Sequence, residues 1–156
     1  MHNVLVTGGS RGLGLGIARR LATAGDCVIA IARKETGQLT SAIEEVQHEA
    51  AGAIHFVPFD LARIQDIPLL VRKLRKEFGS IYGLVNNAAI VCDGALALMH
   101  DSRIEQLVRM NTLSPIVLTK YVVRSMMADG GGRIVNVASI IGFTGYSGLS
   151  VYGATK

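Results

Sequence analysis

A cluster of glycines directly after a short apolar run limits what this chain can fold into more than any other feature. Five of its 18 glycines fall between Gly8 and Gly16, behind the apolar run at residues 3–7. Residues 14–24 follow with an apolar stripe at helical spacing, and Gly25 supplies a stop signal. A buried strand that passes through a glycine turn into an amphipathic helix predicts a βα unit.

The rest of the chain repeats this alternation of short apolar runs and longer segments of helical period, as in a parallel sheet with right-handed crossovers. The Val- and Ile-rich runs predict strands at residues 3–7, 27–32, 54–59, 83–87 and 133–138. The helical patterns predict helices at residues 14–24, 39–49, 64–78 and 102–127. We therefore expect an α/β fold, a doubly wound (Rossmann) parallel sheet in strand order 3-2-1-4-5 with helices on both faces.

Length and composition agree with one buried parallel sheet and exclude several classes of protein. The 156 residues suit a single domain over 1–156, and 49% of them are hydrophobic but only 5% aromatic. No apolar stretch is long enough for a membrane span or an export signal. Cys27 and Cys92 lack the spacing of a disulfide framework, so we expect reduced thiols in a cytoplasmic protein.

The net charge of +4 raises nucleic acid as a partner, but the distribution of the charge argues against it. Basic residues are scattered, and aromatic residues that could stack on bases are few. The densest basic cluster, at residues 72–76, falls on a predicted helix, and we interpret it as a solvated helix face. The four histidines do not cluster in sequence, which argues against a metal site.

The turn Thr7-Gly8-Gly9-Ser10-Arg11-Gly12-Leu13-Gly14 lies between a predicted strand and a predicted helix. Gly8 permits the sharp turn out of the strand, Gly12 lets the backbone approach a pyrophosphate, and Gly14 lets the helix pack closely on the sheet. A plain glycine-rich turn is the alternative. The position and spacing of the glycines favour dinucleotide binding at this first βα turn.

Further motifs make the chain resemble the short-chain dehydrogenase/reductase family. The glycine turn differs by one residue from the common Gly-x-Gly-x-x-Gly pattern and is similar to the variant found in this family. Asn86-Asn87-Ala88-Ala89 resembles the family's Asn-Asn-Ala-Gly, with Ala89 in place of the last glycine. Asp60-Leu61, after the third predicted strand, resembles the family's aspartate that contacts the adenine.

The same resemblance covers a set of acid-base residues. Ser139, Tyr152 and Lys156 give the family's serine and its Tyr-x-x-x-Lys motif, and Asn111 lies in the long helical region. If Tyr152 and Lys156 share a helix, the ammonium lies near the phenol and favours its ionised form. The resemblance implies that Tyr152 donates a proton while Ser139 holds the substrate oxygen. Lys156 would also hold the nicotinamide ribose, and Asn111 a water of the proton relay. A strand-end serine, a helix-interior asparagine and a surface Tyr/Lys pair are the alternatives.

The end of the second predicted strand bears on the choice of cofactor. A carboxylate there would select NAD through the ribose 2′-hydroxyl, but the first position holds Arg33. Arg33 and Arg11 can bind a 2′-phosphate, which favours NADPH/NADP. Glu35 is the competing observation, because a shift of the loop could bring its carboxylate near the ribose. The residues expected to bind this cofactor are Gly8, Ser10, Arg11, Gly12, Leu13, Gly14, Arg33, Asp60, Leu61, Asn87, Ala88, Tyr152 and Lys156.

The resemblance implies an NADP-dependent enzyme that reduces a carbonyl to a hydroxyl by hydride transfer. The glycine turn, residues 133–135 and the glycine-rich stretch 142–152 are most like those of 3-oxoacyl-acyl carrier protein reductases, which act in fatty acid biosynthesis. The expected substrate is then a 3-oxoacyl thioester, carried on acyl carrier protein. Steroid and sugar reductases share the same catalytic residues, so these substrate classes stay open.

Members of this family usually continue for about another hundred residues past the Tyr-x-x-x-Lys motif and form homodimers or homotetramers. We therefore expect the C-terminal strands of the sheet to be absent from a chain that stops at Lys156, and the fifth strand to form an open edge. Two alternatives to an active enzyme follow. One is a dinucleotide-binding sensor or interaction protein without turnover, and the other is an incomplete fragment without activity.

Overall fold

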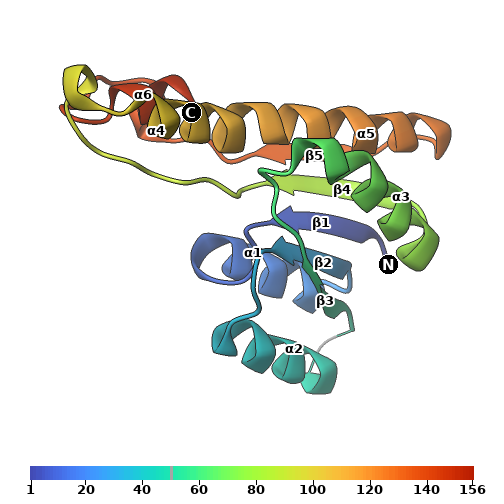
Figure 1. The fold of residues 1–156 in the computed structure, drawn as a ribbon. Helices are drawn as coiled ribbons and strands as arrows, with labels where there is room; N and C mark the ends of the chain where they lie inside the picture. The colour runs from blue at the N-terminus through green and yellow to red at the C-terminus, as the bar shows by residue number, and fades with distance from the viewer. Residues whose placement is uncertain (50) are drawn as a thin grey trace.

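The computed structural model describes residues 1–49 and 51–156, which form one parallel sheet with helices on both of its faces (Figure 1). The strand order is β3-β2-β1-β4-β5, and each strand pairing is parallel. This order confirms the fold expected from the sequence. The strands are β1 (Asn3–Thr7), β2 (Cys27–Ala32), β3 (Ala53–Pro58), β4 (Ile81–Asn86) and β5 (Arg133–Asn136).

The helices follow the strands in the expected alternation, with one correction. The predicted long helix at 102–127 is divided into two α-helices by a π-helical turn, η3. The α-helices are α1 (Gly12–Thr23), α2 (Gly37–Glu49), α3 (Ile67–Phe78), α4 (Asp101–Val108), α5 (Ser114–Ala128) and α6 (Ser150–Ala154). The shorter turns are η1 (Ile64–Asp66), η2 (Leu96–Leu98), η3 (Arg109–Leu113) and η4 (Ile140–Gly142).

Strands β1 and β2 are buried because alternate side chains enter two separate cores, one on each face of the sheet. Leu5 belongs to the core that α3 and α5 complete, while Val4 and Val6 belong to the core that α1 and α2 complete. Small and branched aliphatic side chains fill both cores, as the low aromatic content predicts. The two cores fix the carboxyl ends of the central strands.

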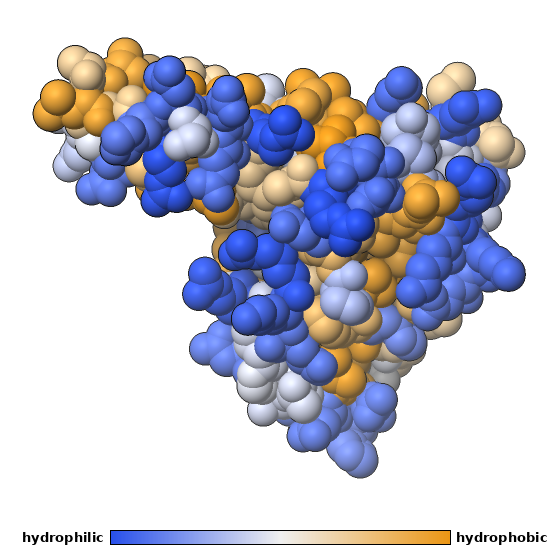
Figure 2. Space-filling model, viewed as in Figure 1, coloured by the Kyte–Doolittle hydropathy of each residue, from blue (hydrophilic) through white to orange (hydrophobic). Residues whose placement is uncertain are grey.

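The β5 edge of the sheet is far less covered by helices than the central strands are. All four residues of β5 are exposed, and α4 and α6 lie past the ends of the strands (Figure 1). Ile140, Phe143 and Tyr146, which precede α6, are 74%, 88% and 67% exposed. Figure 2 shows apolar surface gathered at this end of the molecule. The β5 edge and the segment around α6 therefore carry much of the exposed apolar surface.

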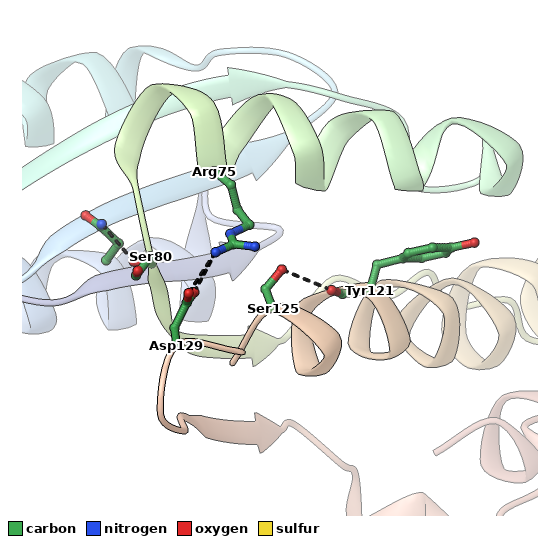
Figure 3. Close-up of polar contacts among 6 residues, drawn as sticks. Arg75, Ser80, Tyr121, Ser125 and Asp129 are labelled. Atoms are coloured by element: carbon green, nitrogen blue, oxygen red, sulfur yellow. Dashed lines mark hydrogen bonds and ion pairs between the residues drawn. The ribbon is translucent and has the colours of Figure 1, made fainter. Parts of the chain in front are cut away.

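Helix α3 contacts the end of α5 through an ion pair that corrects one expectation from the sequence. Arg75, from the basic cluster expected to be solvated, is only half-exposed and donates from Nη2 to both carboxylate oxygens of Asp129, at 2.8 and 2.9 Å (Figure 3). Next to it, Asn3 Nδ2 donates to the Ser80 carbonyl at 2.9 Å, which ties β1 to the start of β4. These contacts connect the two halves of the sheet.

Neither a membrane-spanning helix nor a metal-binding group is present in the described parts of the chain. None of these helices combines the length and the apolar character that crossing a membrane requires. No three His, Cys, Asp or Glu side chains among the same residues lie together as metal ligands would. Cys27 and Cys92 are both free thiols, and burial raises the pKa of the Cys27 thiol.

Candidate functional site

A cleft of about 940 Å³ opens at the carboxyl ends of the strands, between the loops that follow β1, β2, β3 and β4. This is the position at which doubly wound sheets bind ligands. The loop residues that the sequence assigned to cofactor binding all line it. They are Gly8, Ser10, Arg11, Gly12, Leu13, Gly14, Arg33, Asp60, Leu61, Asn87 and Ala88.

The glycines of the first loop are required by its geometry. Gly8 has φ +67° and Gly12 has φ +54°, backbone conformations that side-chain-bearing residues rarely adopt. A Cβ atom added at Gly14 would lie 2.3 Å from the Gly8 carbonyl oxygen and 2.5 Å from Asn87 Nδ2. Helix α1 can therefore begin directly against the loop only because residue 14 has no side chain.

The start of α1 fits a bound phosphate. Arg11 occupies the N-cap position, its side chain makes no capping hydrogen bond, and the first turn contains no acidic residue. The first backbone N–H groups of a helix lack intrahelical acceptors and carry a partial positive charge. An anion at the cleft would meet these free donors, so the loop and the helix can hold the pyrophosphate of a dinucleotide.

Thr7 and Asn87 lock the ends of β1 and β4 together beneath the loop. The buried Thr7 hydroxyl donates to the Val85 carbonyl at 3.2 Å and accepts from the backbone amides of Asn87 and Ala88, at 2.9 and 3.0 Å. Asn87 Nδ2 donates in return to the Thr7 carbonyl at 2.9 Å. Sequence reasoning missed Thr7 as part of the site, although its position between the strand and Gly8 was visible.

Three cationic side chains stand on one wall of the cleft. Arg11, Arg33 and Lys34 are exposed and line it, and none of them forms an ion pair with an acid of the described residues. Glu35, the carboxylate that could favour NAD instead, accepts a hydrogen bond from Thr40 Oγ1 on α2 at 3.3 Å. The wall therefore offers positive charge that no ion pair among the described residues neutralises.

Asn111 lies within the π-helical turn η3 and not in a regular helix interior. Its buried side chain accepts from the Ile90 amide at 2.9 Å and donates to the Ile90 carbonyl at 2.8 Å. Its Nδ2 also donates to Thr155 Oγ1 at 3.0 Å. Asn111 thus joins a loop that lines the cleft to the segment that carries Tyr152 and Lys156. A π-turn of this kind often marks a functional position.

None of the four predicted acid-base residues lines the cleft. They are Asn111, Ser139, Tyr152 and Lys156. Ser139 Oγ accepts from the Ile141 amide at 3.3 Å, as the cap of η4. Tyr152 is in α6, and Lys156 lies two residues after the last residue of that helix. Lys156 Nζ donates to the Val137 carbonyl at 2.6 Å, and burial lowers the pKa of its ammonium.

Several cleft residues carry no motif that sequence reasoning could have used. Thr36 bonds the Ser10 carbonyl from 26 positions away, and Gln106 and Met110 reach the cleft from the α4–η3 segment. These contacts depend on how the loops are folded together, not on local spacing. The remaining lining residues are Ala89, the last residue of the Asn86–Ala89 motif, and, outside the motifs, Ile31, Ala32, Gln38, Phe59, Ala62 and Ile90.

Comparison with known proteins agrees with this geometry. The family model described as short chain dehydrogenase matches residues 2–156, so the chain belongs to the short-chain dehydrogenase/reductase family. It is similar to the ketoacyl reductase HetN of Nostoc sp., with 37% identity over 98% of this chain and 53% of that protein. It is also 37% identical to the 3-oxoacyl-[acyl-carrier-protein] reductase FabG of Escherichia coli, over 97% of this chain and 60% of FabG.

A solved structure is similar over nearly the whole chain. It is a metagenomic short-chain oxidoreductase in complex with NADP, with a TM-score of 0.92 and 29% identity over 99% of this chain and 70% of that one. The chain thus spans only 53% and 60% of the length of the two curated relatives described above.

Proposed function

We propose that the chain provides the dinucleotide-binding and acid-base residues of an NADPH-dependent carbonyl reductase. One observation carries the choice of cofactor: Arg11, Arg33 and Lys34 line the cleft without acidic partners among the described residues, while Glu35 is hydrogen-bonded to α2. Guanidinium groups bind a phosphate through charge-assisted hydrogen bonds, which a free 2′-hydroxyl cannot match. A metagenomic relative whose structure contains NADP supports the same choice.

The residues around the cleft would hold the parts of NADPH separately. The loop at Gly8–Gly14 and the start of α1 would hold the pyrophosphate, and Arg11 with Arg33 the 2′-phosphate. Asp60-Leu61 would contact the adenine. Asn87-Ala88 would line the nicotinamide side, and Tyr152 with Lys156 would hold the nicotinamide ribose. When bound, the nicotinamide supplies the hydride for carbonyl reduction.

The acid-base work falls to the residues beside the cleft. The Tyr152 phenol would donate a proton to the carbonyl oxygen, and the Ser139 hydroxyl would hydrogen-bond that oxygen as negative charge develops on it. The Lys156 ammonium would hold a ribose hydroxyl after exchanging its present acceptor, the Val137 carbonyl. Asn111 would hold a relay water, while its hydrogen bond to Thr155 keeps η3 beside the Tyr152 segment.

We propose a 3-oxoacyl thioester carried on acyl carrier protein as the substrate, in a cytoplasmic homodimer or homotetramer. The support is the similarity to a ketoacyl reductase and to a 3-oxoacyl-[acyl-carrier-protein] reductase. The free thiols of Cys27 and Cys92 fit a reducing compartment. A panel of acyl-thioester, steroid and sugar carbonyls, each assayed by NADPH oxidation, tests the substrate class. Turnover of a steroid or sugar carbonyl without any turnover of acetoacetyl thioesters would reject it.

Cofactor binding is tested by fluorescence titration of the chain with NADPH and with NADH at one fixed salt concentration. We expect tighter binding of NADPH, because the three cations can contact its 2′-phosphate, which NADH lacks. Salt weakens these contacts by screening, so both titrations use the same salt concentration. Equal affinities, or tighter binding of NADH, would contradict the proposed cofactor.

The role of Tyr152 is tested by Tyr152→Phe, which keeps the ring and removes the phenol. We expect turnover to fall by about 10²- to 10⁴-fold, the usual contribution of general acid catalysis, with little change in the Kd of NADPH. Tyr146→Phe, which removes the phenol of an exposed tyrosine, is the matched control. Activity above about a tenth of wild type in Tyr152→Phe would show that another group donates the proton.

Dinucleotide binding without turnover is a second candidate function, and two observations favour it. Lys156 Nζ is bonded to the Val137 carbonyl, and the four acid-base residues lie outside the cleft lining. A single-turnover experiment separates the two functions, with NADPH bound and a carbonyl substrate in excess. Hydride transfer supports the reductase, whereas binding of NADPH without oxidation across the panel supports the sensor.

A further inference from the structure

The glycine loop is held firmly at its two ends. At the first end, the Gly8 amide donates to the Ile31 carbonyl at 2.8 Å, and Asn87 Nδ2 donates to the Gly8 carbonyl at 3.4 Å. At the other end, Gly14 packs directly on the Gly8 carbonyl, with no space for a Cβ atom. These contacts connect the pyrophosphate-facing glycines to β2 and β4. They do not involve the middle of the loop, where Ser10 and Arg11 lie.

Thr36 contacts that middle. Its Oγ1 donates to the Ser10 carbonyl and accepts from the Leu39 amide at 3.2 Å, so both functions of the hydroxyl are used. Across residues 1–49 and 51–156, Thr36 is the one side chain that hydrogen-bonds the stretch 9–12. The contact is partly buried and joins the first βα loop to the start of α2.

We propose that Thr36 is a positioning residue that sets the preference of the cleft for a dinucleotide with a 2′-phosphate. This inference rests on the proposed function. Arg11 directly follows the bonded Ser10, and Arg33 lies three residues before Thr36, so one hydrogen bond links the segments that carry the two guanidinium groups. Without this hydrogen bond, the segment of Ser10 and Arg11 is no longer held to the segment that carries Arg33, whereas Gly8 and Gly14 stay held by other contacts. The entropic cost of ordering Arg11 then lowers the affinity for NADPH, whose 2′-phosphate Arg11 contacts, more than the affinity for NADH.

The test compares the Kd values of NADPH and NADH for wild type and Thr36→Val. We expect the Kd of NADPH to rise about three- to tenfold, as for the loss of one neutral hydrogen bond, and that of NADH by less than about twofold. Thr36→Ser, which keeps the donor and the acceptor, should restore the wild-type ratio. Thr23→Val is the matched control, because the exposed Thr23 hydroxyl donates to the Arg19 carbonyl at the end of α1 and contacts neither the glycine loop nor Glu35.

Thr36→Val also removes one of the two acceptors of the Leu39 amide at the start of α2, the other being the Thr36 carbonyl, so each variant is melted as well. A lower Tm with equal changes in both Kd values would reduce Thr36 to a structural residue and overturn the proposal. Hydrogen exchange of the ligand-free chain gives a readout that does not depend on cofactor choice. We expect the amides of Arg11 and Gly12 to exchange faster in Thr36→Val, and unchanged exchange would overturn the proposal.

The two proposals fail in different ways. Wild-type protein without a preference for NADPH contradicts the proposed cofactor and, with it, the role of Thr36 in that preference. A wild-type preference that persists unchanged in Thr36→Val contradicts the role of Thr36 alone.

Discussion

The centre of the sheet and its β5 edge are built from the same kind of strand but are buried very differently. In β1 and β2, every residue except one per strand is buried, whereas all four residues of β5 are exposed. The central strands have helices on both faces, while the segment after β5 presents Ile140 and Phe143 to solvent. The loops that line the cleft follow β1, β2, β3 and β4, of which β1, β2 and β4 are well buried.

Cofactor binding and acid-base catalysis, as proposed, therefore depend on parts of unequal stability. Cofactor-binding loops are fixed by rigid strands and by the Thr7–Asn87 hydrogen bonds below them. Ser139 and Tyr152, in contrast, follow an exposed edge strand and lie in or near the five-residue α6. Regions with few buried apolar contacts open more readily than the core. Cofactor binding should therefore withstand conditions that already disturb the catalytic segment.

The largest expected effect comes from truncating one apolar side chain in each region. Leu5→Ala, at a residue with 0% exposure in β1, should lower the free energy of unfolding by about 2 to 5 kcal/mol. Phe143→Ala, at a residue that is 88% exposed, should change it by less than about 0.5 kcal/mol. Urea unfolding followed by circular dichroism measures both. Similar losses in the two variants would remove the contrast between the regions.

The sequence predicted the fold well because buried parallel strands are continuous apolar runs. β1 and β2 have the predicted bounds, and the ends of the other strands shift by one or two residues. Helix periodicity did not reveal η3, since the π-turn is only five residues long and helix continues on both sides of it. The predicted single helix at 102–127 was therefore wrong in its middle.

The cleft was easier to predict than the acid-base residues. Its loops each follow a strand, and parallel strands bring their carboxyl ends to one edge, so a motif after each strand locates the cleft. The contact of Lys156 Nζ with the Val137 carbonyl could not be read from the Tyr-x-x-x-Lys spacing, because it joins residues 19 positions apart. The Thr36–Ser10 contact joins residues 26 positions apart and follows no local pattern.

Arg33 allows a test of the electrostatics of the cleft, which lies at the ends of the well-buried central strands. Arg33→Ala should cost about 1.5 to 3 kcal/mol of NADPH affinity, as for a lost charged hydrogen-bond partner, and leave NADH affinity almost unchanged. Arg33→Asp should move the preference further toward NADH, since a carboxylate repels the phosphate and can accept from the free hydroxyl. Titrations at one salt concentration give the Kd ratios, and Arg72→Ala, on the exposed face of α3, is the control. A constant ratio in all variants would make Arg33 a solvated residue without a role in selection.

Substitutions at two glycines of α1 distinguish the effect of close packing from the effect of helix propensity. Gly14→Ala should destabilise the chain by about 1 to 3 kcal/mol, because its Cβ meets the Gly8 carbonyl at 2.3 Å, and should weaken NADPH binding as the loop moves. Gly16→Ala meets nothing within 4 Å and should instead stabilise the helix by up to about 1 kcal/mol, with binding intact. Thermal melts and NADPH titrations measure the pair. Normal binding in Gly14→Ala would show that the loop accommodates a side chain there.

The smallest expected effect concerns the contact that joins the two regions. Arg75 and Asp129 form a partly exposed pair between α3 and the residue after α5, in which one guanidinium nitrogen donates to both carboxylate oxygens (Figure 3). Such pairs contribute about 0.2 to 1 kcal/mol, because the attraction in water is offset by the entropy of holding a long side chain. A double-mutant cycle with Arg75→Met and Asp129→Asn isolates this coupling in urea unfolding. The coupling should shrink in high salt, since the pair is partly open to solvent. A coupling well above about 1 kcal/mol at high salt would mean that the pair, and not apolar packing, fixes α5 on α3.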